Sequence, residues 1–272
     1  MSLVLTAPRA CVFACLLSSG LVGCGAARAP ARVPPARVGS APTEADTPAR
    51  ALARRVAEAA GLARLGEVAE LRFTFVVERG GERAFVASHV WDLRAGRDRV
   101  RWTDEGRAWD VVVDLRARTA AGTVDGAPIA AADTAAAAAQ AYERWVNDAY
   151  WLVLPLKLLD AGVQLAVEAP RVHEGRPHEV LALSFSGVGL TPGDRYWLLV
   201  DPETHRIARW EMVLEGQSPP PRGTSFIAYE ALGPLTLALD HVNDDGTRHI
   251  RFEGVEALGR VVESDFVIDA SR

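Results

Sequence analysis

Short segments that alternate apolar and polar residues, each followed by a turn, constrain the fold of this chain more than any other feature. Segments 71–77 and 84–93 alternate in this way, and two glycines lie in the connection 79–82, a pattern typical of a β-hairpin. Segments 99–103 and 108–114 continue the series. Strands joined by such short turns pair with their neighbours in the sequence. The pattern therefore predicts an antiparallel meander.

The same alternation returns in the second half of the chain. The strands expected there are 164–167, 178–184, 195–200, 207–215, 224–229, 235–243, 249–255 and 261–268. We therefore predict a mainly β (α+β) fold in which about nine to eleven strands form one large, curved antiparallel sheet.

Two segments have helical spacing instead. The apolar residues of 51–65 recur on one face of an amphipathic helix. Asp133 or Thr134 is placed to cap a second, alanine-rich helix that continues to Trp145. An apolar run follows it, and we expect Pro155 to break or kink a helix there.

The N-terminus has the features of a bacterial secretory signal. Arg9 precedes an apolar run that ends at Cys24 and is shorter than the about 20 residues that span a membrane. The residues 21–24 (Leu-Val-Gly-Cys) resemble the lipobox of bacterial lipoproteins, in which the signal is cut before a cysteine that carries acyl chains. An ordinary cleaved signal peptide is the alternative.

This interpretation divides the chain into a signal peptide, 1–23, a lipidated cysteine with a disordered Pro/Ala-rich tether, 24–50, and a single domain, 51–272. Because Gly25 rather than Asp follows Cys24, the lipoprotein sorting rule favours the outer membrane, at its periplasmic face, over the inner membrane. The membrane is then a partner through the acyl anchor.

Composition narrows the function further. The three cysteines, Cys11, Cys15 and Cys24, all lie at or before the proposed anchor, so disulfides, thiol catalysis and cysteine metal sites are excluded from the domain. The net charge of −5 gives no basic surface for nucleic acid. We expect no cofactor.

The sequence offers little support for catalysis or metal binding. His173 and His178 flank a turn, His205 lies in an Asp-Pro turn, and 243–246 (Asn-Asp-Asp-Gly) suits a hairpin turn better than a calcium loop. No Gly-x-Ser-x-Gly motif is present. We therefore predict a non-enzymatic protein, although histidine and acidic residues that converge in space would favour a hydrolase.

Aromatic and leucine residues concentrate between the two series of strands. Trp145, Tyr150, Trp151 and Leu154 lie in this segment. One interpretation is that the segment fills the open side of the sheet as core. The other is that it lines or covers an apolar cavity for an acyl chain.

The order of these elements resembles that of the LolA/LolB-like lipoprotein-localisation superfamily. Within that superfamily, the chain is similar to uncharacterised outer-membrane lipoproteins. The resemblance rests on Asp-Pro-x-Thr in 200–207, on 147–151 and on 187–197. It implies an incomplete antiparallel half-barrel whose apolar concave face is covered by helices and binds lipid. The candidate cavity-lining residues are Trp145, Tyr150, Trp151, Leu154 and Trp197. No position matches the insertion loop of a lipoprotein receptor.

Two functions follow from the sequence. The first is a membrane-anchored periplasmic lipoprotein that binds an acyl chain, a lipid or a lipoprotein in a half-barrel cavity. The second is a structural or interaction module of the cell envelope with a filled core and no ligand.

Overall fold

Thirteen strands form one antiparallel sheet within the residues that the computed structural model describes, 47–186 and 193–268. The strands are β1 Glu70–Arg79, β2 Glu82–Asp92, β3 Arg97–Asp104, β4 Arg107–Asp114, β5 Ala120–Val124, β6 Ala127–Pro128, β7 Val163–His173, β8 Arg176–Phe185, β9 Arg195–Val200, β10 Ile207–Val213, β11 Arg222–Leu232, β12 Leu235–Asn243 and β13 Arg248–Leu258. The predicted mainly β fold with one large antiparallel sheet is confirmed. The signal peptide, Cys24 and the tether up to residue 46 lie outside the described residues.

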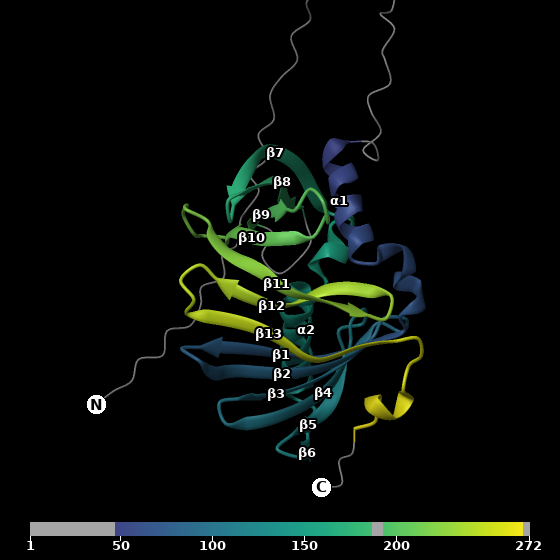
Figure 1. Ribbon diagram of the computed structural model, residues 1–272. Coiled ribbons are helices and arrows are strands. Elements are labelled where there is room, and N and C mark those ends of the chain that lie inside the picture. The colour runs from purple at the N-terminus through teal and green to yellow at the C-terminus, as the bar shows by residue number, and fades with distance from the viewer. Residues whose placement is uncertain (1–46, 187–192, 269–272) are drawn as a thin grey trace, which may run out of the picture. The chain divides into compact units, whose positions relative to one another are not determined.

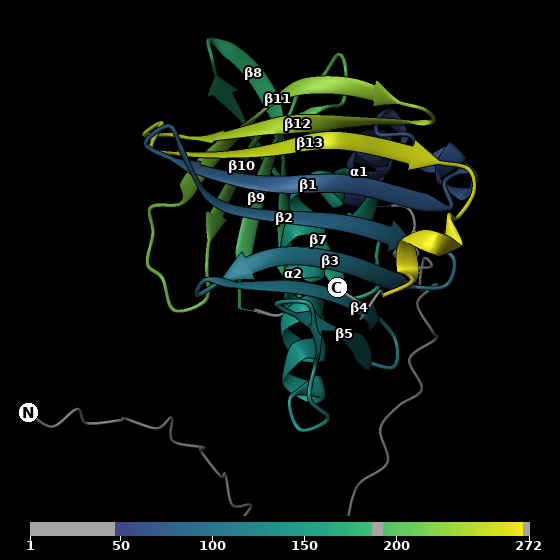
Figure 2. The same ribbon diagram turned by 90° about the horizontal axis from the view of Figure 1, so that it is seen from below.

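The order of the strands places the first and the last of the described strands side by side. It runs β6-β5-β4-β3-β2-β1-β13-β12-β11-β10-β9-β8-β7, so two meanders meet where β1 pairs with β13. The helix α2, Thr134–Lys157, connects β6 at one edge to β7 at the other. It therefore crosses the concave side, where Figures 1 and 2 show the strands curving around it.

The helix α1, Pro48–Ala59, begins earlier than predicted. The Thr47 hydroxyl accepts a hydrogen bond from the Arg50 amide, and Pro48 occupies the first turn, where a missing N–H costs nothing. Leu52 and Val56 bury its apolar face. The helix ends before Gly61, whose φ is +99°, and the short helix η2, Leu62–Glu67, follows.

Of the two effects expected of Pro155, a break or a kink, the break is wrong, since α2 continues through Pro155 to Lys157. A proline removes one backbone hydrogen bond from a helix and crowds the preceding turn, at about 3 kcal/mol or more. Here it lies in the last turn, and the side chains beside it, Leu152, Leu154 and Leu156, are buried. Burial of these apolar side chains offsets the lost bond.

The C-terminal strand expected at 261–268 is also wrong. This segment contains the short helix η3, Glu263–Phe266. Arg99 Nη1 donates to the carbonyls of Asp265 and Val267, while the Arg97 guanidinium lies 4.1 Å from the Phe266 ring centroid. Alternation alone did not reveal that the segment packs through side chains rather than by strand pairing.

The weakest strands were missed. The strands β5 and β6 contain alanine, glycine and proline, which have low strand propensity. They lie at the edge of the sheet beside β4. The turns predicted at 79–82 and 243–246 are present, and each joins a pair of adjacent strands.

Candidate functional site

The two halves of α2 pack differently against the sheet. In the first half, the small residues Ala137, Ala138 and Ala141 are buried and let the helix approach β3, β4 and β5 closely. In the second half, the side chains are larger, and they face either the main core or an open space. Leu152 and Leu154 are buried in the main core, whereas Tyr150 and Trp151 face an open space.

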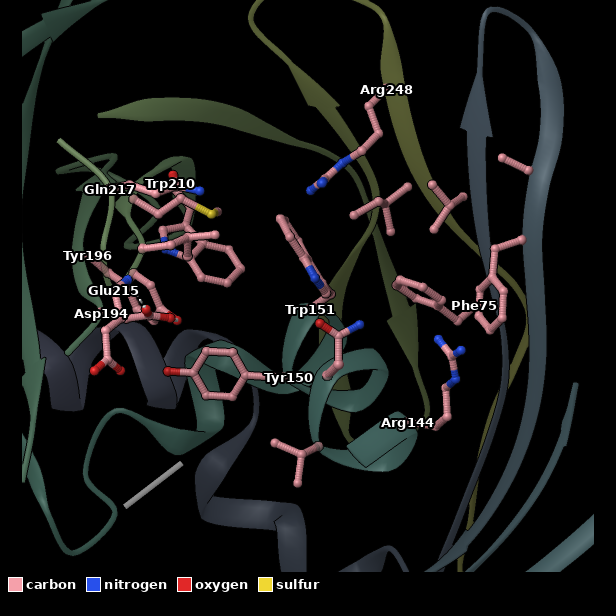
Figure 3. Close-up of a pocket in the computed structure, with 18 of the residues that line it drawn as sticks. Phe75, Arg144, Tyr150, Trp151, Asp194, Tyr196, Trp210, Glu215, Gln217 and Arg248 are labelled. Carbon is pink, nitrogen blue, oxygen red and sulfur yellow. Dashed lines mark hydrogen bonds between the residues drawn. The ribbon is translucent and has the colours of Figure 1, made fainter. Parts of the chain in front are cut away.

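That space is a cavity of about 780 Å³, within the roughly 300–1,000 Å³ typical of small-molecule sites. Its walls come from α2 and from β1, β2, β8, β9, β10 and β13 (Figure 3). Side chains alternate across a strand, so every second residue faces inward. The rows that this produces are Phe75, Val77 and Arg79 on β1, Arg248 and Ile250 on β13, and Trp210 and Met212 on β10.

Aromatic rings form one side of the cavity. The Trp151 and Trp210 ring centroids lie 4.4 Å apart, and the Tyr196 ring meets Trp210 edge to face at 4.9 Å. Tyr150 contacts the same indole at 5.9 Å. Rings that contact one another in this way restrict each other's orientation, so this wall is preformed.

One end of the cavity is acidic, with Asp194 and Glu215, and the Asp194 carboxylate accepts hydrogen bonds from within the protein. Tyr196 Oη donates to Asp194 Oδ2 at 2.7 Å, and the Glu215 amide donates to Asp194 Oδ1 at 2.7 Å. Burial and the Asp194 carboxylate raise the pKa of Tyr196, which stays a neutral hydroxyl. Asp194 thus fastens β9 to the segment after β10.

His241 lies behind the aromatic wall. Its ring is buried between Phe226, at 4.2 Å, and Trp151, at 5.8 Å, and neither nitrogen has a hydrogen-bond partner among the described residues. Burial, with His249 nearby, lowers the pKa of His241 to about 3. The imidazole is therefore neutral and serves as part of the apolar packing.

A second polar cluster, unforeseen from the sequence, lies inside the protein. His89 Nδ1 lies 2.8 Å from Asp98 Oδ2, and its Nε2 lies 3.2 Å from Asp148 Oδ2. All three side chains are completely buried. Burial opposes the charged imidazole, but the two carboxylates raise the pKa of His89 to about 9.

This is the kind of convergence that would favour a hydrolase, but no side chain of the cluster is open to solvent. Both imidazole nitrogens contact carboxylates, which leaves neither to act on a substrate. The cluster instead ties α2 to β2 and β3, because Asp148 lies on α2 and the other two residues on those strands.

No protein-family model matches the sequence, and no curated protein matches it. The chain is similar in fold to solved structures. A LolA superfamily protein from Nitrosomonas europaea shares 9% identity and a TM-score of 0.47, covering 79% of this chain and 97% of the other. A DUF1329 family protein from Desulfovibrio piger has 11% identity and a TM-score of 0.44, covering 81% and 97%.

A putative outer membrane lipoprotein-sorting protein domain from Vibrio parahaemolyticus has 9% identity and a TM-score of 0.44, covering 80% and 95%. Similarity at this level assigns no role to any residue of this chain.

The five candidate cavity residues divide between three surroundings. Tyr150 and Trp151 line the cavity. Trp145 packs edge to face on Trp91 at 5.2 Å, and Leu154 is fully buried in the core. Trp197 Nε1 donates to Glu168 at 2.8 Å, away from the cavity that its neighbour Tyr196 lines.

The residues that sequence reasoning missed come from distant strands. Trp210, Arg248 and Phe75 reach the cavity only because β10, β13 and β1 curve around α2. Strand alternation shows which residues share a face, but it does not show which face is concave. To predict these residues from the sequence, one would also have to know that β1 pairs with β13.

Two further searches gave no site. Among residues 47–186 and 193–268, no three histidine, cysteine or acidic residues gather as they would to hold a metal ion. In the same ranges, no helix combines the length and the apolar character needed to cross a bilayer.

Proposed function

We propose that this protein is a non-enzymatic lipoprotein of the bacterial cell envelope that binds an acyl chain, as part of a lipid or a lipoprotein, in the cavity beside α2. The observation that carries the proposal is a cavity of about 780 Å³ that is lined largely by aromatic and aliphatic side chains and is open to solvent. Apolar surface of this kind is stabilised when an apolar ligand displaces water from it.

The aromatic wall supports an acyl chain over a compact polar ligand. Trp151 and Trp210 present ring faces and edges, and Phe75 stands across the cavity from Trp210 (Figure 3). Ile250 on β13 also lines the cavity. Each buried methylene of a chain contributes about 0.8 kcal/mol. A chain along this wall therefore gains affinity with length.

Cys24 supplies the proposed anchor. The acyl chains on this cysteine would hold the protein at the periplasmic face of the outer membrane without a membrane-spanning helix. An anchored protein would receive or hold lipid at that surface rather than diffuse as a shuttle. Metabolic labelling with an alkyne fatty acid tests the anchor, because the Cys24→Ser chain should lose the label that the unchanged chain takes up.

Lipid analysis of the intact protein tests the cavity. Organic extraction of the full chain, purified from its bacterial host, should release non-covalent lipid that mass spectrometry detects, while acyl chains on Cys24 remain with the protein. The Val146→Trp substitution should abolish this lipid, because Val146 lines the cavity and a larger side chain would fill it.

Glu143→Trp is the matched control, since Glu143 is exposed on the same helix and does not line the cavity. It should retain the lipid. A folded, unchanged chain that releases no lipid would contradict lipid binding and would favour the structural or interaction module.

A further inference from the structure

Three arginines line one side of the cavity without an acidic partner. Arg79 on β1, Arg144 on α2 and Arg248 on β13 all belong to its wall. None of their side chains makes a hydrogen bond or an ion pair with a described residue. Several sheet arginines are paired instead, as Arg99 is with Asp110 and Arg209 with Asp244.

Two of these arginines lie directly opposite each other. Arg79 and Arg248 are register partners of β1 and β13, and both face the cavity. Like charges in directly opposed positions of an antiparallel pair destabilise the sheet. Glu82 on β2 is the register partner of Arg79 on its other side, but it forms no ion pair with Arg79, and no described carboxylate acts on Arg248. The cost of the Arg248 charge is therefore present in the ligand-free protein.

Aromatic rings hold two of the guanidinium groups in place. The Arg248 guanidinium carbon lies 5.4 Å from the Trp151 ring centroid, and that of Arg144 lies 4.3 Å from the Phe85 centroid. A stacked guanidinium keeps its N–H donors at the edge of the plane, where they remain free for an anion. Figure 3 shows both groups extending toward the space beside Trp151 and Phe75.

The charge of Arg248 is uncompensated. Burial, together with Arg79 and Arg222, lowers the pKa of Arg248 from its ordinary value, and no carboxylate acts in the opposite direction. An arginine nevertheless stays protonated near neutral pH. A bound anion would supply the counter-charge that the protein does not.

We propose that the cavity binds an anionic amphiphile, whose carboxylate or phosphate lies between Arg248, Arg144 and Arg79 while its acyl chain follows the Trp151–Trp210 wall. This inference rests on the proposed function and narrows its ligand class. The carboxylate of a fatty acid and the phosphate of a lipid headgroup share the chemistry that the guanidinium groups recognise.

The test compares amphiphiles that share one chain and differ in charge. The full chain, made by cell-free synthesis without membranes, carries no acyl anchor. Palmitate, monopalmitoylglycerol and cetyltrimethylammonium are each titrated below their micelle concentrations, with Trp151 and Trp210 fluorescence as the signal. Palmitate should bind at least about tenfold more tightly than the neutral lipid, and the cationic one should bind most weakly.

Arg248→Gln should remove about tenfold of the palmitate affinity while leaving monopalmitoylglycerol unchanged, and it should not lower the melting temperature, because it relieves the Arg79–Arg248 repulsion. Arg251→Gln is the matched control. Arg251 lies on the same strand but pairs with Glu78 and Asp240 outside the cavity, so its loss should not change selectivity for palmitate.

The possible failures are distinguishable. Equal affinity for palmitate and the neutral lipid would overturn the anionic preference and leave lipid binding intact. Failure of a folded chain to bind any amphiphile would overturn both proposals. Inorganic phosphate that binds as tightly as palmitate would overturn the amphiphile in favour of a simple anion site.

Discussion

His89 on β2 and Asp148 on α2 meet at 3.2 Å through Nε2 and Oδ2, with both side chains completely buried. Asp98 on β3 holds the other imidazole nitrogen at 2.8 Å. One side chain therefore joins the helix to two strands of the sheet that curves around it. The position of α2, and with it one wall of the cavity, depends on this contact.

His89→Gln should lower the free energy of unfolding by about 3 kcal/mol at neutral pH, because removing the cation leaves two buried carboxylates without a counter-charge. Urea denaturation measures the change. Gln140→Ala is a suitable control, because Gln140 on α2 also donates a hydrogen bond to an aspartate of the sheet, Asp104 on β3. This contact is half-buried rather than fully buried. A change of less than about 1 kcal/mol in the His89 variant would contradict a tie between helix and sheet.

The His89 contribution should also depend on pH. The folded pKa of about 9 lies above the ordinary 6.5, so the stabilisation is complete below pH 6.5 and is lost as the pH rises through 9. The stability difference between the unchanged chain and His89→Gln should shrink across this range. A difference that grows with pH would mean that the imidazole is neutral when folded.

Arg99→Ala should destabilise the protein by about 2 kcal/mol, because the buried guanidinium bonds both Asp110 and the C-terminal carbonyls of Asp265 and Val267. Hydrogen exchange should become faster in η3. The matched control is Arg101→Ala, which removes a bond to the same Asp110 from a half-exposed side chain and should cost less than about 1 kcal/mol. Equal losses would exclude a special role for the C-terminal contacts.

Gly61→Ala should cost about 3 kcal/mol or more. Residue 61 has a φ of +99°, and an added Cβ would lie 2.3 Å from the Pro234 carbonyl oxygen. Gly80→Ala is the control, because its φ of +60° is also unfavourable but nothing lies within 4 Å; it should cost about 1–2 kcal/mol. Thermal unfolding of both variants separates backbone strain from the clash.

Trp151→Ala should weaken acyl-chain binding and lower stability by about 3 kcal/mol, since it removes a wall of the cavity and a buried ring that packs on Trp210. Trp197→Ala should leave binding unchanged, because its side chain bonds Glu168 instead. Fluorescence titration and urea denaturation provide the two readouts. Equal effects on binding would place the ligand elsewhere.

The sequence was informative where a pattern is local. Alternation and short turns predicted the antiparallel sheet, and the bounds of β9 and β12 agree with those expected. It was misleading at Pro155, because burial of the surrounding leucines, a tertiary effect, keeps the helix intact. The low-propensity strand β5 gave no signal of its own.

The cavity was only partly predictable for the same reason. Tyr150 and Trp151 are neighbours in one aromatic segment of the sequence, whereas Arg79 and Arg248 are far apart in the sequence and meet only through the β1–β13 pairing. Trp197, a candidate from the sequence, bonds Glu168 instead, whereas its neighbour Tyr196 lines the cavity. A shift of one residue along a strand reverses the face that a side chain occupies.

The pairing of β1 with β13 has a consequence for folding. The first of the described strands finds one of its two neighbours only once the last of them, β13, is available. Until then β1 exposes an unpaired edge that favours association with other chains, and the long sequence separation of the final contact slows its formation. An incompletely folded form of this protein would therefore need protection of that edge until β13 pairs with it.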